Sequence, residues 1–186
     1  MKKIFNITLV LFAAILLISC RNGDNDIPED IHEHEEIGKV VLKLTNKADA
    51  SEVHTVNIIA GVADGHPHLA QGATYLAEVD FQVKHDDHYH SSEDILEEKD
   101  HHFITYSFAN SDIKIIRSAN DVVRTDGKKL GLKTEWTVNS TSSTGKVNIK
   151  LNHGATSVDD NYPSADNQLG RAIGGESDVD VIIDLH

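Results

Sequence analysis

Hydrophobic and polar residues alternate in short runs from about Gly38 to the end of the chain. In the first run, Val40, Leu42 and Leu44 stand at every second position. A period of two places such residues on one face of a β-strand. The same pattern predicts strands at residues 40–44, 54–60, 74–85, 101–108, 113–118, 130–138, 145–153 and 179–185.

Turn-forming residues separate these runs, most clearly at 110–112, 126–127 and 140–145. Only residues 92–99 have a helical pattern, in which Ser92 is expected to cap the first turn. Many short strands without alternating helices predict an all-β fold, an antiparallel immunoglobulin-like β-sandwich of about eight strands with one short helix. The expected core is Val40, Leu42, Leu44, Tyr75, Val79, Phe81, Val83, Ile104, Tyr106, Phe108, Trp136, Val147, Ile149, Leu151, Val181 and Ile183.

The first residues have the pattern of a secretory signal peptide. Lys2 and Lys3 precede an apolar stretch at 4–18, which is shorter than the ~20 residues needed to span a bilayer core. The closing residues, Leu17-Ile18-Ser19-Cys20, resemble the lipobox of bacterial lipoproteins. The resemblance implies removal of residues 1–19 and attachment of acyl chains to the cysteine, which hold a protein on a membrane.

Residues 20–37 are acidic and poor in apolar side chains, so they are expected to be a solvated tether that carries the acylated Cys20. The sandwich domain is expected at 38–186. Arg21 follows the cysteine in place of the aspartate that retains such lipoproteins at the inner membrane. The lipobox resemblance therefore also implies the outer membrane, with the domain on its periplasmic or cell-surface side.

The chain has a formal net charge of −13 and a single cysteine. Binding to nucleic acid requires a basic face, so the charge argues against that partner. With Cys20 alone, neither disulfides nor thiolate metal sites are available to the domain. The sequence has no G-x-S-x-G and no helical H-E-x-x-H motif, and we predict that the protein is not an enzyme. A hydrolytic zinc site at His88 and His90 is the one enzymatic alternative.

Twelve histidines stand out, and most occur in close pairs beside acidic residues. They form HEHEE at 32–36, HPH at 66–68, HDDHYH at 85–90 and DHH at 100–102. Imidazole is a common ligand of late first-row transition metals, so these tracts predict metal binding. Nitrogen and oxygen ligands without sulfur suit zinc, copper or nickel, and we take zinc as the default.

Strand parity suggests which histidines meet. His85 and His102 have the inward parity of their strands, and those strands are expected to form a hairpin, which would bring the two residues together. If every connection reverses the chain, His153 joins them, also with inward parity. One end of the sandwich would then hold His54, His85, His88, His90, His101, His102 and His153. The opposite end would hold His32, His34, His66, His68 and His186.

The candidate metal ligands are therefore His85, His88, His90, His101, His102, His153, His54, His66 and His68. Neighbouring carboxylates would ligate the ion or orient the rings. The rigid Pro67 is expected to keep His66 and His68 from binding one ion side by side, so they would serve different ions or reach toward 32–36. The alternatives are solvated loop residues, or a pH sensor in which clustered histidines titrate.

Two segments, at 97–103 and 174–181, resemble small lipoproteins of Bacteroidetes-type bacteria. The first is an acidic, histidine-containing entry into an aromatic strand, and the second is a closing strand after a Gly-Gly-Glu-Ser-Asp turn. The resemblance implies a β-sandwich lipoprotein associated with TonB-dependent receptors of the outer membrane, in some cases linked to metal uptake. We expect a lipoprotein that concentrates or delivers metal ions for such a receptor. The alternative is a structural or adhesive sandwich that binds a protein or glycan.

Overall fold

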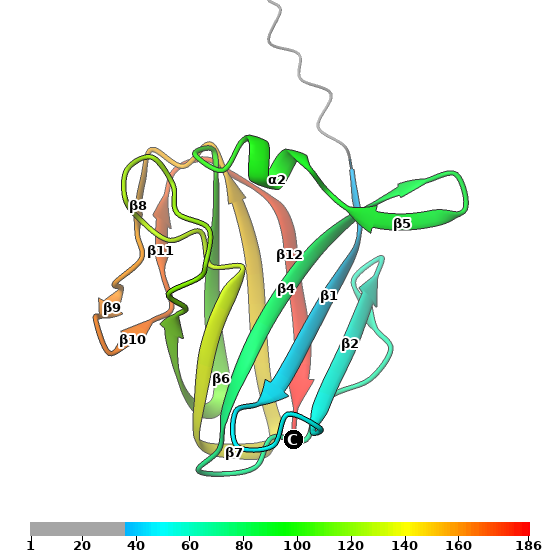
Figure 1. Ribbon diagram of the computed structural model, residues 1–186, viewed down its shortest axis with the longest axis vertical. Coiled ribbons are helices and arrows are strands. Elements are labelled where there is room, and N and C mark those ends of the chain that lie inside the picture. The colour runs from blue at the N-terminus through cyan, green and yellow to red at the C-terminus, as the bar shows by residue number, and fades with distance from the viewer. Residues whose placement is uncertain (1–35) are drawn as a thin grey trace, which may run out of the picture. The chain divides into compact units, whose positions relative to one another are not determined.

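The alternating runs are β-strands in the computed structural model, which describes residues 36–186 (Figure 1). An eight-stranded sheet comprises β1 (Ile37–Asn46), β2 (Val53–Ile59), β3 (Val62–Ala63), β4 (Thr74–His85), β5 (His88–Ser91), β6 (His102–Arg117), β7 (Lys133–His153) and β12 (Glu176–Leu185). Two antiparallel pairs lie apart from it: β8 (Ser157–Asp159) with β11 (Arg171–Ile173), and β9 (Pro163–Ser164) with β10 (Asn167–Gln168). The described helix is α2 (Asp94–Glu97). The predicted all-β sandwich with one short helix is confirmed.

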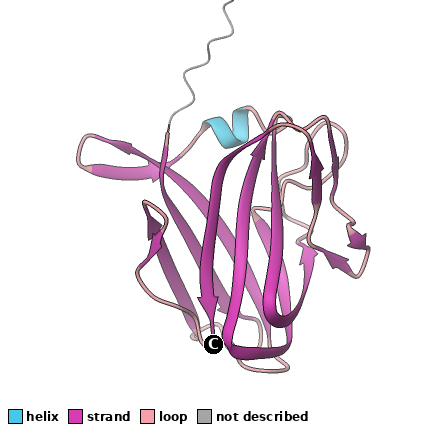
Figure 2. Ribbon diagram, turned by 180° about the vertical axis from the view of Figure 1, so that it is seen from behind, coloured by secondary structure: helices cyan, strands magenta, loops and turns pink. Residues whose placement is uncertain are grey.

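The sheet folds over on itself because β6 and β7 both bend near their middle. β6 turns at Asn110, whose φ is 54°, and its pairing partner on β7 changes from Lys146 to Thr141 across the bend. The second half of β6 pairs with the first half of β7. These two halves, together with β4, β1, β2 and β3, form a front sheet. The other halves and β12 form a back sheet, nearest the viewer in Figure 2.

The strands predicted at 101–108 and 113–118 are therefore the two halves of β6, and those predicted at 130–138 and 145–153 are the two halves of β7. The turn-formers at 110–112 and 140–145 mark these bends rather than strand ends. Because both strands bend at the same level, their hydrogen-bond ladder resumes beyond the corner after register shifts between Ala109 and Ser111 and between Asp112 and Ile113. A single ladder thus supplies both layers of the sandwich.

The core lies between the two layers, as the alternation predicts. Every expected core residue is buried except Phe108, which is partly buried with its ring edge-on to Trp136. Polar atoms of the large aromatic residues are satisfied: Tyr106 donates to the Gly131 carbonyl at 2.6 Å and Trp136 donates to Thr134 Oγ1 at 2.8 Å. Each buried Leu or Ile side chain contributes about 1.5–3 kcal/mol relative to its exposed state. This core holds the strand ends, and hence the histidines, in place.

The predicted hairpin between residues 74–85 and 101–108 is wrong. The end of β4 pairs instead with the short strand β5 across a two-residue turn, in which His85 is opposite His88 and Asp86 has a φ of 53°. Asp tolerates this left-handed conformation better than most residues do. β6 pairs with β7 rather than with β4. β4 and β5 therefore form an arm that projects from the sandwich (Figure 1).

The sandwich has two ends, upper and lower in the view of Figure 1. The upper end carries the start of β1 at Ile37, the start of β6 and the end of β7, whereas the lower end carries the end of β12 (Figure 1). β1 pairs antiparallel with both β2 and β4, so β2 and β4 run in the same direction. After β3 the chain returns through residues 64–73 to the lower end, where β4 begins. The assumption that every connection reverses the chain fails at this return.

The helix is shorter than predicted and is capped differently. It spans Asp94–Glu97 rather than residues 92–99, and its N-cap is Glu93, which makes no capping hydrogen bond through its side chain. Ser92, the expected cap, is buried, and its hydroxyl has no hydrogen-bond partner within residues 36–186. Ile95 anchors the helix on the core. Packing of this kind, rather than intrinsic helix propensity, supplies most of the stability of short helices in proteins.

Candidate metal centre

At the lower end, two segments far apart in the sequence bring three histidines together. His66 and His68 lie in the connection that follows β3, and His186 follows the last strand, β12. The backbone N–H of His186 donates to the carbonyl of Pro67 at 3.2 Å, which ties the two segments together. Pro67 is buried, and the histidines on either side of it are exposed. We call His66, His68 and His186 the lower-end cluster.

All three rings of the lower-end cluster are in mutual contact. Their centres are 3.9 Å apart for His66 and His186, 4.9 Å for His66 and His68, and 5.5 Å for His68 and His186. Ring nitrogens about 2.0–2.1 Å from a tetrahedral zinc ion place the centres of two ligand rings roughly 5 Å apart. Two of the three spacings, 4.9 and 5.5 Å, are close to that value, whereas His66 and His186 are closer to each other than two ligand rings would be. The rings of His66 and His68 meet edge to face at 82° across the buried Pro67. Whether the two bind one ion, which the sequence argued against, stays a prediction.

The nitrogen donors of this cluster do not yet converge on one point. Within residues 36–186, no group of three or more His, Cys, Asp or Glu side chains is arranged to hold a metal ion. In the lower-end cluster, the rings of His66 and His186 are stacked at 24° to one another, so their nitrogens do not point to a common centre. The exposed side chains of His66 and His68 are free to change rotamer, a motion that takes picoseconds to nanoseconds on a surface. A change of these rotamers would be needed before the three rings could bind one ion.

One nitrogen of the cluster has no role in the fold. His186 Nδ1 is buried and has no hydrogen-bond partner among the described residues. A buried polar atom without a partner normally costs about 1–3 kcal/mol, and such atoms are rare in native structures. Asp184 lies near the same cluster: a hydrogen bond from Lys146 and the charge of that ammonium lower the pKa of Asp184, and His186 and His66 act in the same direction. The lower end thus has an unused nitrogen donor with a carboxylate beside it.

At the upper end, His101, His102 and His153 form a second group, which we call the upper-end cluster. His102 and His153 are directly opposite each other on β6 and β7, with ring centres 5.1 Å apart, and His101 is 6.0 Å from His153. His102 is only 2% exposed. Its inward parity, and the proximity of His153 to it, follow the prediction.

Both nitrogens of His102 face groups of the fold: Nδ1 has a hydrogen-bond partner, and Nε2 lies near a carboxylate with which it forms an ion pair when the ring is protonated. Nδ1 is 3.1 Å from the backbone oxygen of Glu98, and a carbonyl can only accept, so Nδ1 carries the proton. Nε2 faces Asp178 Oδ2 at 3.5 Å. His102 and Asp178 line a cavity of about 230 Å³ together with Glu36 and Asp94. A histidine fixed through Nδ1 by a carbonyl is the arrangement that many metal ligands share, yet here the same contacts suffice to keep a strand-end residue satisfied.

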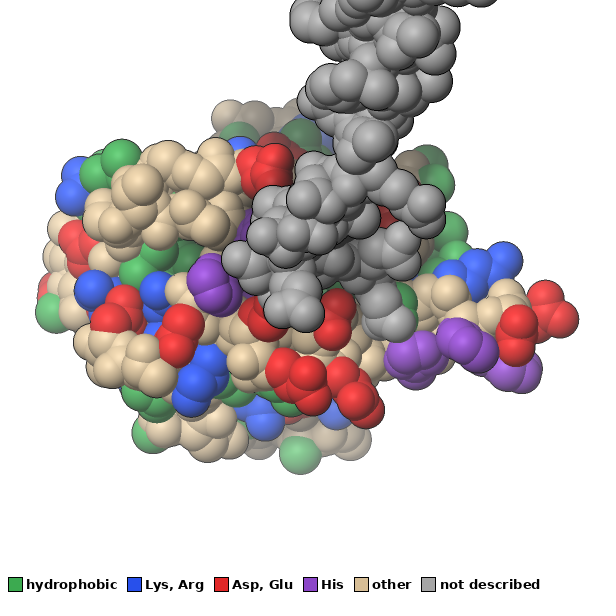
Figure 3. Space-filling view, turned by 90° about the horizontal axis from the view of Figure 1, so that it is seen from above, with side chains coloured by type: hydrophobic (Ala, Val, Ile, Leu, Met, Phe, Trp, Pro, Cys, Tyr) green, Lys and Arg blue, Asp and Glu red, His purple; other side chains and the backbone are tan. Residues whose placement is uncertain are grey.

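The arm formed by β4 and β5 holds the remaining histidines of the upper end. His85, His88 and His90 are all exposed, and the rings of His85 and His90 are 6.2 Å apart. Figure 3 shows histidine side chains gathered on this arm with acidic side chains beside them. His85 was predicted to point inward beside His102. It points to solvent instead, because β4 leaves the core before its last two residues and pairs with β5 there.

His54 was predicted at the upper end and lies at the lower end. It is opposite Leu44 near the start of β2, because the return after β3 reverses the expected direction of this strand. Its Nε2 is 3.3 Å from Glu52 Oε1. The same carboxylate accepts a 2.7 Å hydrogen bond from Tyr75, and this bond is the main cause of the lowered pKa of Glu52. His54 therefore belongs to a local hydrogen-bond group and not to either cluster.

The candidate ligands predicted from the sequence do not include His186, although the strand pattern predicts it at the same end as His66 and His68. The signal was present, since a strand that ends at Leu185 carries the next residue to the rim of the sheet. Asp178 beside His102 was missed altogether, because pairing between β12 and β7 sets its position and no spacing reveals it. The predicted lipid attachment at Cys20, the signal peptide at 1–19, and His32 and His34 lie outside the described residues.

No helix within residues 36–186 is long and apolar enough to cross a membrane. Comparison with protein-family models, with curated proteins and with solved structures finds no match to this chain.

Proposed function

We propose that this protein is a lipid-anchored metal-binding protein of the outer membrane, which holds a late first-row transition ion, zinc by preference, at the lower-end cluster. The observation that carries the proposal is the mutual contact of His66, His68 and His186, whose ring centres are 3.9–5.5 Å apart. The buried, unpartnered Nδ1 of His186 supports it, because a metal ion would satisfy that atom.

The chemistry of the donors favours zinc over harder ions. Imidazole nitrogen suits zinc, copper and nickel, whereas calcium and magnesium prefer oxygen. Three protein nitrogens leave the fourth tetrahedral position for water or for a carboxylate such as Asp184. A site of this kind on an exposed rim releases its ion more readily than a closed four-ligand site does. These properties suit a protein that concentrates and hands over ions better than one that uses metal to hold its fold.

The position of the cluster agrees with delivery to a receptor. The domain begins at Ile37 at the upper end, and the lower-end cluster is at the other end of the sandwich (Figure 1). Attachment of Cys20 to the membrane would tether the domain through its upper end and leave the lower end accessible. Tethering raises the local concentration of bound ions near a membrane receptor of the TonB-dependent kind.

Calorimetric titration with Zn²⁺ tests the proposal. The starting protein is the chain from Arg21 onward with His32 and His34 changed to Ala, so that the histidines that remain lie within the described residues. The expected result is one zinc ion bound per chain, with an affinity that falls about 100-fold or more in the variant His66→Ala, His68→Ala, His186→Ala, since lost ligands cost more than the 10–100-fold typical of outer-shell groups.

A matched control changes three exposed histidines of the arm instead: His85→Ala, His88→Ala, His90→Ala. We expect this control to bind zinc as the parent does. Equal affinity in the lower-end variant and the parent would contradict the proposal, and a loss in the arm variant alone would move the site to the arm.

A further inference from the structure

The cavity of about 230 Å³ at the upper end, which we call the upper-end cavity, is lined by acidic side chains. It lies where the start of β1, the residues around the start of α2, the start of β6 and the start of β12 meet. Its polar lining residues are Glu36, Ser92, Asp94, His102 and Asp178, and no Lys or Arg of residues 36–186 lines it. With three carboxylates against one imidazole, these residues carry at least two more negative than positive charges, whether or not His102 is protonated. The upper-end cavity therefore favours a cation.

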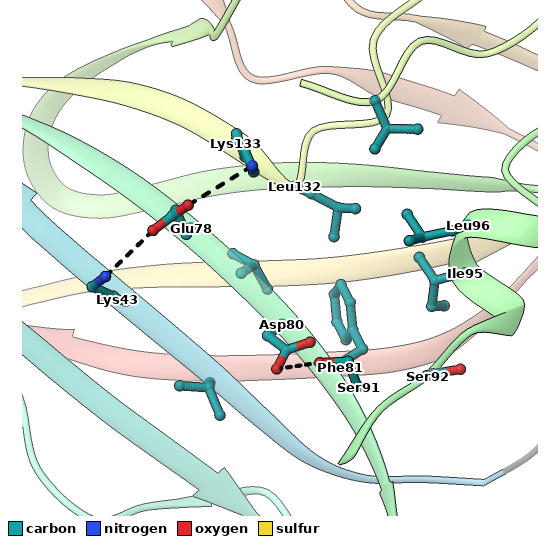
Figure 4. Close-up of a pocket in the computed structure, with 13 residues that line it drawn as sticks. Lys43, Glu78, Asp80, Phe81, Ser91, Ser92, Ile95, Leu96, Leu132 and Lys133 are labelled. Atoms are coloured by element: carbon teal, nitrogen blue, oxygen red, sulfur yellow. Dashed lines mark hydrogen bonds and ion pairs between the residues drawn. The ribbon is translucent and has the colours of Figure 1, made fainter. Parts of the chain in front are cut away.

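A larger neighbouring cavity, of about 500 Å³ in the front sheet, has no such excess of charge (Figure 4). Ser92 lines both cavities, but the larger one also contains Lys43 and Lys133 opposite Glu78 and Asp80. Glu78 lies 3.6 Å from Lys43 and 4.0 Å from Lys133, so it neutralises both of their ammonium groups in part. Charge selects a ligand only at the smaller cavity.

The hydroxyl of Ser92 is a buried group that the fold leaves unused. Ser92 is 5% exposed, and its Oγ has no hydrogen-bond partner in the described part of the chain. In Figure 4 this oxygen points away from Phe81 and Asp80, which line the larger cavity. Buried hydroxyls without a partner are rare, because the hydrogen bonds lost to water are not replaced. A donor bound in the upper-end cavity would supply the missing partner.

A second pair of atoms at the upper-end cavity also accepts a donor. Since Nδ1 of His102 donates to the Glu98 carbonyl, Nε2 of the neutral ring has a lone pair. This nitrogen is 3.5 Å from Asp178 Oδ2. Two acceptors cannot bond to each other, so the hydrogen between them comes from protonation of the ring or from a bound donor. The Asp178 side chain is 28% exposed and can be reached by such a donor.

An ammonium group suits these acceptors better than a metal ion does. Ligand atoms of zinc or calcium lie about 2.0–2.6 Å from one point, and no group of three or more His, Asp or Glu side chains within residues 36–186 has that arrangement. An ammonium group forms longer hydrogen bonds, of about 2.8 Å, and has three N–H donors that point in different directions. The cavity volume is also several times the ~30 Å³ of a water molecule, which leaves room for a short carbon chain beside the partly buried Ile37.

We propose that the upper-end cavity binds a small primary ammonium ion, whose N–H groups donate to Ser92 Oγ and to the carboxylates of Asp94 and Asp178. The negative charge of Glu36 at the rim adds to the attraction. The site shares no residue with the lower-end cluster and selects a different chemical group, so it is independent of the proposed metal site.

The test is an NMR titration of the chain from Arg21 onward with butylammonium at constant ionic strength. Butanol is the neutral probe of the same chain length, and tetramethylammonium is a cation without N–H donors. We expect butylammonium to shift the backbone amide signals of Ser92 and His102 to saturation, and to bind at least about tenfold more tightly than either other probe, because only it combines charge with N–H donors.

Substitution of Asp178 tests the position of the site. Asp178→Asn should weaken butylammonium about tenfold, as expected for a charge-assisted hydrogen bond at a partly exposed group. Asp180→Asn is the matched control: it removes the same charge from the same strand, but Asp180 pairs with Lys150 on the back sheet and does not line the cavity. This control should bind butylammonium as the parent does, and so should the variant His66→Ala, His68→Ala, His186→Ala.

Ser92→Ala separates a ligand contact from a structural role. It should weaken butylammonium about threefold or more, yet the variant without ligand should be no less stable than the parent in urea denaturation, because the deleted hydroxyl has no partner in the described part of the chain. The proposal is overturned if butylammonium gives no saturable shift, if tetramethylammonium binds as tightly, or if Asp178→Asn or Ser92→Ala keeps the parent's affinity.

Discussion

The two ends of the sandwich each bring three histidines together, but the surroundings differ. In the upper-end cluster, His102 is 2% exposed, and its nitrogens face the Glu98 carbonyl and Asp178. In the lower-end cluster, His66 and His68 are exposed, and Nδ1 of His186 is buried without a partner. Proximity of imidazoles is therefore a poor guide by itself. What separates a candidate ligand from a structural histidine is whether the fold already uses its nitrogens.

The largest expected effect concerns stabilisation by zinc. A ligand at 100 times its dissociation constant stabilises the folded state by about 2.7 kcal/mol when it binds only that state. We expect zinc to raise the free energy of unfolding of the parent by about this amount in urea titrations. The variant that lacks the lower-end cluster should show no such increase, whereas the variant that lacks the arm histidines should keep it. An increase that survives loss of the lower-end cluster would reverse the assignment of the two ends.

Without metal, a substitution in the upper-end cluster should reduce the stability of the fold more than one in the lower-end cluster. His102→Ala removes a buried side chain together with its hydrogen bond to the Glu98 carbonyl and opens a cavity, so it should destabilise the fold by about 1–3 kcal/mol. His66→Ala changes an exposed side chain and should alter stability by no more than about 0.5 kcal/mol. Urea denaturation of both variants without zinc measures the difference. Equal effects would mean that the upper-end cluster is no more structural than the lower one.

The smallest effect concerns Asp184, whose lowered pKa is caused chiefly by the hydrogen bond from Lys146. Lys146→Met should raise the pKa of Asp184 toward its ordinary value, measured by carbon NMR of the carboxyl group during an acid titration. A lowered folded-state pKa contributes stability that is present above the unfolded value of 3.8 and is lost as the pH falls through the folded value. The variant should therefore be less stable than the parent only above that range, and equally stable below it.

Zinc sharpens the same measurement. A divalent ion at the lower-end cluster would lower the pKa of Asp184 further, because a positive charge nearby favours the carboxylate. The reference is the variant His66→Ala, His68→Ala, His186→Ala, in which zinc should leave the titration unchanged. An identical titration with and without zinc in the parent would count against an ion at this end.

Much of the fold could be read from single strands. Val40, Leu42 and Leu44 are buried as their period of two requires, and so are Ile104 and Tyr106 on a strand far along the chain. Phe108 is the exception, because it stands close to the bend of β6, where the two layers diverge. Periodicity is a local property of the chain, and burial on one face follows from it directly.

Pairing between strands could not be read in the same way. The pattern of residues 85–90 does not show that His85 and His88 face each other across a two-residue turn, and this turn removes His85 from the neighbourhood of His102. Arg117 is a second example: it is 1% exposed and donates to the Ile104 and Lys129 carbonyls, although its sequence context shows only the end of a strand. Both arrangements depend on contacts between segments that lie apart in the sequence.

The sequence by itself determined that this protein is a β-sandwich whose metal ligands, if it binds a metal, are nitrogen and oxygen atoms, because its hydrophobic period is two and its only cysteine is Cys20. The tertiary structure alone decided which histidines meet. A period of two specifies which face of a strand is buried, but not the direction of the strand or its neighbours. The return through residues 64–73 lets β2 and β4 run in the same direction on either side of β1. That return carries His66 and His68 to the end of β12, where Pro67 accepts the hydrogen bond of His186.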